Sequence, residues 1–254
     1  MIYQEPDNWK DLQDKVGEIL KLSNFKVEIE KKVQSIRSEI EIDVFATELI
    51  DGRPYKIICE CKNWKSNIPQ IYVHALRTVV NDIGANKAYI ISTSNFQKGA
   101  IDSSEDTNIE LVSWESFQGL FFKTWYINFF SKNLHQILKT DYNQTAIQFF
   151  DDFDIINKKD FRVLIDKYET LQIIASHFPP PIFKEFPNEF KEIENKLPLK
   201  TKLKLEEWEV DSLKIPNEIL EVEFYSSFLN LISDYARTVY CELDKLNLDL
   251  TEDE

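Results

Sequence analysis

Residues 39–62, EIEIDVFATELIDGRPYKIICECK, decide the fold of this 254-residue chain. Residues 39–46 alternate apolar and polar side chains, and residues 55–62 are rich in apolar and β-branched residues, as strands are. Between the two runs stands Asp51-Gly52, a pair favoured in two-residue hairpin turns. The stretch therefore predicts a β-hairpin made of strands 39–49 and 53–62.

The hairpin carries a group of charged side chains. In a strand, residues i and i+2 lie on the same face. Glu60 and Lys62 then share a face with Ile58, opposite small apolar residues suited to a core: Ile57, Cys59 and Cys61. In the other strand Asp43 shares its face with Glu39 and Glu41, opposite Ile40, Ile42 and Val44. Pairing the strands is expected to bring Asp43 beside Glu60.

Further elements extend on both sides of the hairpin. Apolar spacing predicts a helix over 9–22 and a strand over 25–32. After the hairpin we expect a helix from Pro69 to Gly84, a strand at 88–93, a helix at 96–106 and a strand at 109–114. One face of the first of these helices is expected to hold Ile71, Ala75, Val79 and Ile83. The order α-β-β-β-α-β-α-β predicts an α/β fold, a mixed sheet flanked by helices.

After residue 115 the pattern becomes mostly helical. Residues 115–139 are dense in aromatic side chains, and further helices are expected near 144–153, 159–176, 182–196 and 217–246. TKLKLEEWEV, residues 201–210, alternates enough to form a pair of strands instead. We therefore predict two domains, 1–125 and 126–254, the second for oligomerisation, partner binding or sensing.

Composition limits the classes of protein that fit. The net charge is −14, with 14 basic and 19 acidic residues in 1–120 and 16 and 25 in 121–254, so the chain does not grip DNA by bulk charge. The more acidic second half is expected to face solvent or a protein partner. Because no run of eighteen apolar residues and no signal pattern occurs, we expect a soluble, cytoplasmic protein without a membrane segment. Three cysteines without a CxxC pair predict buried thiols rather than a disulfide framework or a zinc site.

The charged group of the hairpin suits phosphodiester hydrolysis. That reaction needs a positioned water and stabilisation of the phosphate charge, which a divalent cation supplies. Mg²⁺ prefers carboxylate oxygens, so we expect Asp43 and Glu60 to hold it, aided by the main-chain carbonyl of Cys61; Mn²⁺ is expected to substitute. Lys62 is expected to orient or help deprotonate the attacking water and to offset phosphate charge.

The spacing of these residues resembles a known nuclease motif. IDV, followed by ECK seventeen residues after the aspartate, is similar to the PD-(D/E)xK motif, and residues 9–120 resemble the Mrr-like restriction endonuclease catalytic domain. The matching stretches are LQDKVGEILKLSNFKVE, IRSEIEIDVFA, IICECKNW, IPQIYVHALRTVVNDIGANKAYIIS, NFQKGA and TNIELVSWESF. The resemblance implies a restriction-endonuclease-like fold, cleavage of DNA and a part in restriction–modification or antiviral defence.

The same resemblance implies roles for individual residues. Asp43 and Glu60 match the metal ligands, and Lys62 matches the catalytic lysine. Where many relatives have a glutamate in the first helix, this chain has Gln13, an amide that supplies no negative charge. Gln70, at the start of the helix after ECKNW, matches a polar residue that relatives keep near the metal.

Other charged residues have a functional and a structural interpretation. Arg37, Lys65 and Arg77 fit contacts to DNA phosphates, and each also fits an ordinary surface cation. Glu60 with Lys62, taken alone, fits a surface ion pair. The aromatic residues at 121–130 favour an interdomain core over a platform for stacking bases.

Two functions rival a restriction endonuclease at this point. A structure-selective nuclease, such as a junction resolvase, would use the same core. Alternatively, Gln13 in place of an acid fits a catalytically degenerate nuclease fold that binds nucleic acid or protein.

Overall fold

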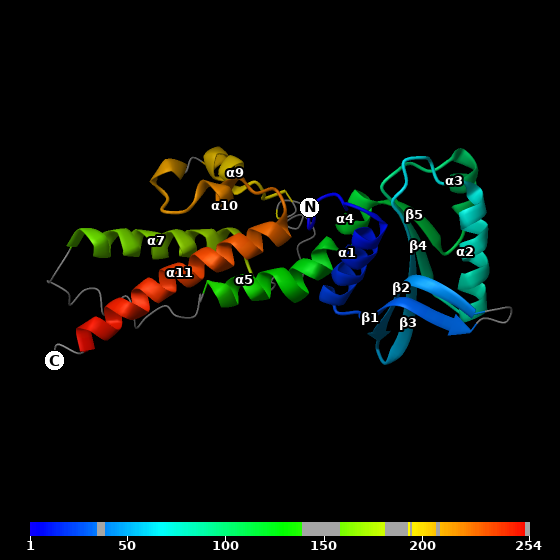
Figure 1. Cartoon of the computed structure of the whole chain (residues 1–254), viewed down its shortest axis with the longest axis horizontal. Coiled ribbons are helices and arrows are strands. Elements are labelled where there is room, and N and C mark those ends of the chain that lie inside the picture. The colour runs from blue at the N-terminus through cyan, green and yellow to red at the C-terminus, as the bar shows by residue number, and fades with distance from the viewer. Residues whose placement is uncertain (35–38, 139–157, 181–192, 194, 207–208, 252–254) are drawn as a thin grey trace. The chain divides into compact units, whose positions relative to one another are not determined.

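The computed structural model describes residues 1–34, 39–138, 158–180, 193, 195–206 and 209–251 (Figure 1). The chain forms two compact units. One comprises Tyr3–Asn128, and the other comprises Met1–Ile2 together with Phe129–Glu254. The division falls inside a π-helix, Tyr126–Phe130, which follows α4 (Trp114–Trp125) and precedes α5 (Ser131–Ile137) in the sequence.

The first unit is built on a five-stranded mixed sheet in the order β1-β2-β3-β4-β5. The pairs β1–β2 and β2–β3 are antiparallel, whereas the pairs β3–β4 and β4–β5 are parallel. Their bounds are Lys26–Gln34, Glu39–Ile50, Arg53–Lys62, Lys87–Ser92 and Ile109–Ser113. Asp51 and Gly52 both have positive φ, 50° and 78°, as the predicted hairpin turn between β2 and β3 requires.

Helices cover both faces of this sheet. Figure 1 shows α1 (Trp9–Leu22) and α4 on one side, and α2 (Gln70–Ile83) and α3 (Lys98–Ser104) on the other. The predicted α/β fold and element order are confirmed. Gly84 ends α2 in the left-handed conformation, φ 63°, which a glycine adopts without the strain that a Cβ would add.

The face that α2 buries matches the prediction only in part, because Val79 and Ile83 pack against the core cluster but Ile71 does not. Val73, Leu76 and Val80 are buried in the core with Ile58, whereas Ile71 is 63% exposed. The helix has two apolar stripes of similar strength, and periodicity alone does not choose between them.

The β1–β2 ribbon changes faces at Glu30 and Asp43. Glu30 has φ 52°, an uncommon value for a residue other than glycine. The ladder pairs Ile29 with Val44 before this point and Lys31 with Ile42 after it. The two irregular residues therefore stand opposite each other across the ribbon.

Contacts on either side of that point reveal the change of face. Ile29 lies against Gly17 of α1, since a Cβ built on Gly17 would come within 2.8 Å of its Cδ1 atom. Two residues on, the Lys31 ammonium lies 3.9 Å from the ring centroid of Phe45, whose core cluster is packed by α2 and also contains Ile42. The predicted grouping of Ile42 with Val44 on one face is therefore wrong, because the strand is not regular at Asp43.

The second unit is helical. Besides α5 it contains α7, α9, a 3-10 helix, α10 and α11, at Lys158–His177, Leu199–Leu205, Val210–Ser212, Asn217–Glu221 and Tyr225–Thr251. Its aromatic core includes Phe130, Phe178, Tyr225 and Phe228, with ring centroids 5.0–6.3 Å apart in the pairs that touch. The carbonyls of Met1 and Ile2 accept the first N–H groups of α11, which have no partner within the helix.

Several sequence predictions fall in this unit. Helix 159–176 is confirmed by α7, and helix 217–246 is present as α10 and α11. The strand pair at 201–210 is wrong, because Leu199 and Leu203, one helical turn apart, are buried within α9. Segment 144–153 and nearly all of 182–196 lie outside the described residues. Within the described ranges, no helix is both long and apolar enough to cross a bilayer.

The cysteines are free thiols. Cys59 and Cys61 are buried, as expected. Cys241 is exposed, so its predicted burial is wrong.

Candidate active site

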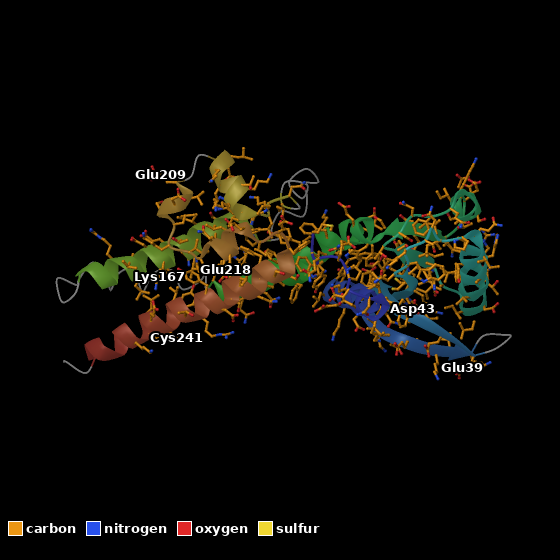
Figure 2. The ribbon with its side chains drawn as sticks, turned by 45° about the horizontal axis from the view of Figure 1, so that its top comes forward. Glu39, Asp43, Lys167, Glu209, Glu218 and Cys241 are labelled. Carbon is orange, nitrogen blue, oxygen red and sulfur yellow. The ribbon has the colours of Figure 1, made fainter. Side chains whose placement is uncertain are left out.

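The site forms where the β2–β3 ladder ends. The last ladder pair is Val44 with Cys59, and beyond it the side chain of Asp43 joins the two strands. The backbone N–H of Cys61 donates to Oδ2 of Asp43 at 2.7 Å, and the carbonyl of Cys61 accepts from the indole Nε1 of Trp9 at 3.1 Å. Both polar groups of the Cys61 backbone are therefore paired with side chains. Asp43 lies part-way along β2, whereas Glu39 lies at the strand's outer end (Figure 2).

Glu60 and Lys62 form an ion pair on β3. The Lys62 ammonium lies 2.5 Å from Oε1 of Glu60, and the lysine side chain is only 13% exposed. Its position is fixed further by two aromatic rings, since the ammonium lies 4.9 Å from the ring centroid of Tyr72 and 5.6 Å from that of Trp64. These rings meet edge to face, with their centroids 5.0 Å apart. Lys62 is thus held by a carboxylate and by cation–π contacts.

The environment disfavours a negative charge on Asp43. Burial, and next the charge of Glu60, raise the pKa of Asp43 from 3.8 to about 6, against the opposing effects of the Cys61 N–H and Lys62. Burial also raises the pKa of the Cys61 thiol well above its usual range, so this thiol stays protonated. The donor that Cys61 offers to a cation is therefore its carbonyl oxygen.

Gln13 supports Asp43 from α1. It is fully buried, and its Nε2 donates to the main-chain carbonyl of Asp43 at 3.0 Å. Its Oε1 accepts from Lys10 at 2.9 Å, and Lys10 also contacts Glu30 at 2.7 Å. The amide therefore satisfies a backbone group at the irregular point of the β1–β2 ribbon, a bond that an ionised glutamate could not make.

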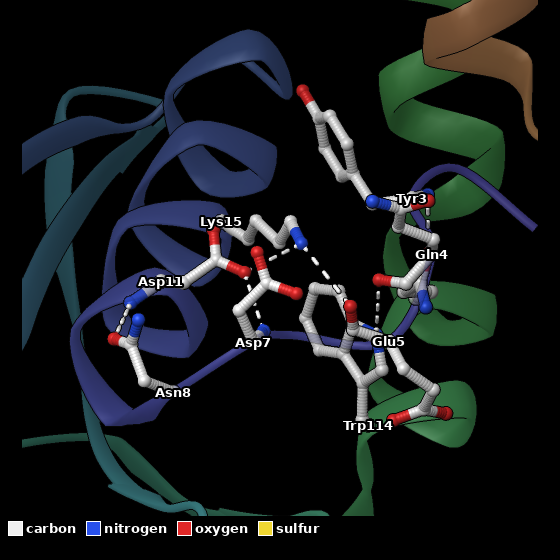
Figure 3. Close-up of polar contacts among 9 residues, drawn as sticks. Tyr3, Gln4, Glu5, Asp7, Asn8, Asp11, Lys15 and Trp114 are labelled. Atoms are coloured by element: carbon white, nitrogen blue, oxygen red, sulfur yellow. Dashed lines mark hydrogen bonds and ion pairs between the residues drawn. The ribbon is translucent and has the colours of Figure 1, made fainter.

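The beginning of α1 is held by the segment before it (Figure 3). Asn8 caps the helix by accepting from the N–H of Asp11 at 3.0 Å, and Lys15 bonds the Asp11 carboxylate at 2.7 Å. Trp114 of α4 donates its indole N–H to the carbonyl of Gln4 at 3.2 Å. These contacts fix the two helical turns that carry Trp9 and Gln13.

Of the four other predicted site residues, the structure describes three. Gln70 is exposed at the start of α2, and its side chain lies against Gly99 of α3. Arg77 is partly buried and donates to the carbonyl of Ser103, which ties α2 to the end of α3. Lys65 is exposed. Arg37 lies outside the described residues.

Sequence reasoning missed three aromatic residues of the site. Trp64 stands two residues after Lys62, so ECKNW already held the signal for one of them. Tyr72 reaches Lys62 from the first turn of α2, a contact that needs the packing of α2 on the sheet. Trp9 meets Cys61 across 52 residues of sequence, and no local pattern points to that contact.

The donors gathered here suit a hard divalent cation. Among the described residues no group of three or more His, Cys, Asp or Glu side chains is placed to hold a metal. The available set is two carboxylates, Asp43 and Glu60, with the Cys61 carbonyl. Mg²⁺ binds through one or two carboxylates and retains several waters, so this oxygen set fits it.

One family model matches the part of the chain that holds this site. Residues 7–121 match the family model of the Mrr catalytic domain, described as a restriction endonuclease. These residues form an Mrr-type restriction endonuclease domain. The matched residues contain the whole β2–β3 hairpin with Asp43, Glu60 and Lys62.

Two solved structures are similar over part of the chain. One is a protein of unknown function, AF1548, with 25% identity over 42% of this chain and 59% of that one, and a TM-score of 0.35. The other is protein VC1899 from Vibrio cholerae, with 17% identity over 46% of this chain and 33% of that one, and a TM-score of 0.34. This chain thus spans less than two thirds of either protein. No curated protein matches it.

Proposed function

We propose that this chain is a Mg²⁺-dependent endonuclease that hydrolyses phosphodiester bonds in DNA, with Asp43, Glu60 and Lys62 as its catalytic residues. One observation carries the proposal. An aspartate from β2 and the peptide of Cys61 on β3 are bonded to each other where the ladder ends, with the Glu60–Lys62 ion pair on the same strand. The match of residues 7–121 to the restriction endonuclease family supports the same reaction.

Each residue has a defined part in this proposal. Asp43, Glu60 and the Cys61 carbonyl would hold the cation, which when bound activates water and stabilises charge on the phosphate. Lys62, held by Glu60 and the rings of Tyr72 and Trp64, offsets phosphate charge and orients the attacking water. Mn²⁺ is expected to replace Mg²⁺, since both are hard cations with oxygen ligands.

The supporting residues act on position. Gln13 is engaged with the Asp43 carbonyl and Lys10, so its proposed part is to orient Asp43 rather than to bind the cation. Gln70 is proposed to contact the site from the start of α2. Arg37, Lys65 and Arg77 are proposed to contact DNA phosphates, and because Arg77 already bonds the Ser103 carbonyl, only part of its guanidinium is available for this.

The biological role proposed is cleavage of foreign or modified DNA in the cytoplasm, within restriction or antiviral defence. The acidic helical unit after Asn128 is proposed to bind a second copy of the chain or a protein partner. Bulk attraction to DNA is weak at a net charge of −14, so recognition depends on local cations around the cleavage site.

One observation favours a second candidate, a degenerate fold that binds without cleaving. Gln13 supplies no charge, and its buried amide serves the backbone of Asp43. A plasmid-cleavage experiment decides between the two functions.

That experiment measures cleavage of supercoiled plasmid by purified wild type with Mg²⁺, with Mn²⁺ and with EDTA. We expect cation-dependent nicking that Asp43→Ala and Lys62→Ala abolish. Glu39→Ala is the matched control, because Glu39 is an exposed acid on the same strand as Asp43. Equal nicking by wild type and both site variants would identify a contaminant and favour the binding module. Preference for four-way junctions over duplexes would favour a resolvase.

A further inference from the structure

The indole of Trp9 bonds the oxygen that the proposed cation needs. Its Nε1 donates to the Cys61 carbonyl at 3.1 Å, and Trp9 itself is 41% exposed at the first position of α1. A tryptophan with this exposure contributes less to core packing than a buried one such as Trp114, which is 1% exposed. Its contact with Cys61 therefore invites a functional explanation.

The contact arises from the shape of the sheet. In an antiparallel ladder the N–H and C=O of one residue point toward the same neighbouring strand. The N–H of Cys61 meets the Asp43 carboxylate, so its carbonyl also points to the side where β2 has left the ladder. A backbone carbonyl without a ladder partner needs another one, and Trp9 supplies it.

A cation and an N–H compete for such an oxygen. The indole proton carries partial positive charge, and it lies against the Cys61 carbonyl oxygen, the atom that would bind the cation. We propose that Trp9 covers the Cys61 carbonyl until a divalent cation takes that oxygen, so that residue 9 sets the cation concentration at which the site fills. The inference rests on the proposed function, because it takes Cys61 as a ligand of the cation.

Removal of the indole N–H should strengthen cation binding. Trp9→Phe keeps an aromatic ring and loses the donor, so the cation no longer has to break a hydrogen bond. One neutral hydrogen bond corresponds to a change in Kd of about two- to tenfold. Isothermal titration of the full chain with Mg²⁺ and with Mn²⁺ should therefore give a lower Kd for Trp9→Phe than for wild type.

Trp114→Phe is the matched control. It removes the same kind of bond, from an indole N–H to a main-chain carbonyl, at Gln4. Its Kd for either cation should equal that of wild type once melting curves show that both variants are folded at the titration temperature. A merely structural role for Trp9 predicts an unchanged or higher Kd in Trp9→Phe, and either result would overturn the proposal.

A second measurement follows the bond itself. The chain has five tryptophans, and Trp9→Phe identifies the indole N–H signal of Trp9 in a ¹H–¹⁵N spectrum. On titration with Mg²⁺ this proton should move upfield as its hydrogen bond is lost. A signal that stays in place while calorimetry shows the site filling would refute the proposal and leave the proposed nuclease intact. Absence of Mg²⁺ and Mn²⁺ binding by both wild type and Trp9→Phe would refute both.

Discussion

The backbone N–H of Cys61 donates to the carboxylate of Asp43 at 2.7 Å, where the β2–β3 ladder ends. The bond ties a candidate catalytic side chain to the strand that carries Glu60 and Lys62. It also satisfies a backbone group that the departure of β2 would leave without a ladder partner. The geometry of the site and the irregularity of the strand therefore have a common origin.

Asp43→Asn should stabilise the fold at neutral and alkaline pH. Because the pKa of Asp43 is raised from 3.8 to about 6, the folded state binds the proton more tightly than the unfolded state does. Well below pH 3.8 Asp43 is protonated in both states and does not change the free energy of unfolding. As pH rises to about 6, its ionisation lowers the free energy of unfolding by at most about 3 kcal/mol. Asparagine avoids this cost, and its carbonyl oxygen still accepts from Cys61.

Melting temperatures measured from pH 3.5 to pH 8 without divalent cations test this. The variant should melt above wild type at pH 8, by a margin that vanishes toward pH 3.5, and it should not cleave DNA. Glu39→Gln, at an exposed acid on the same strand whose charge does not act on Asp43, is the control and should show no such trend. A variant that melts below wild type at pH 8 would show that the carboxylate stabilises the fold.

The hairpin and most of the first unit were predictable because their signals are local. Asp51-Gly52 set the turn and hence the register, and the apolar runs set the strands. The change of face at Asp43 was not predictable, since the rule of alternate faces assumes a regular strand. It depends on the left-handed backbone of Glu30, and the position holds no glycine or asparagine that would have predicted a positive φ.

The contacts of the site divide in the same way. Glu60 and Lys62 are two residues apart on one strand, so their pairing follows from strand geometry alone. The contact of Trp9 with Cys61 and that of Gln13 with Asp43 both depend on how α1 packs on the sheet. In α9, the run TKLKL fits strand alternation and helical spacing equally, and tertiary packing decided for the helix.

Gln13→Glu should destabilise the fold in the absence of divalent cations, and added Mg²⁺ should restore part of the lost stability. An ionised glutamate cannot donate to the Asp43 carbonyl, so a buried acceptor loses its partner, at about 1–3 kcal/mol. The added charge lies near Asp43, and a bound cation would offset it. Unfolding by urea should therefore show a loss of stability that Mg²⁺ partly restores.

Gln118→Glu provides the comparison for that experiment. Gln118 is equally buried, and its Oε1 accepts from the N–H of Tyr3, a bond that glutamate can keep. It belongs to α4 rather than to the site, so Mg²⁺ should restore no stability to this variant. Equal responses to Mg²⁺ in both variants would contradict a cation site near Gln13.

Tyr72→Leu should slow cleavage without weakening binding. The Tyr72 ring lies 4.9 Å from the Lys62 ammonium, and a contact of this kind contributes about 0.5–2 kcal/mol. We expect kcat to fall about two- to thirtyfold as Lys62 loses its fixed position, while KM and the Kd for Mg²⁺ stay unchanged. Tyr72→Phe keeps the ring and should retain the wild-type kcat. A fall in Tyr72→Phe equal to that in Tyr72→Leu would assign the effect to the hydroxyl group.

Gly99→Ala should test Gln70 without altering Gln70 itself. A Cβ on Gly99 would come within 2.7 Å of Oε1 of Gln70, so the flexible amide must move away. Gly99 lies in the first turn of α3, where alanine favours the helix, and we expect no loss of thermal stability.

If Gln70 acts from its present position, Gly99→Ala and Gln70→Ala should lower kcat by similar factors. The double variant should then lose no more than either single one, because both changes remove the same interaction. Independent losses that multiply in the double variant, or wild-type kcat in Gly99→Ala beside an impaired Gln70→Ala, would mean that Gln70 does not act from its place against α3.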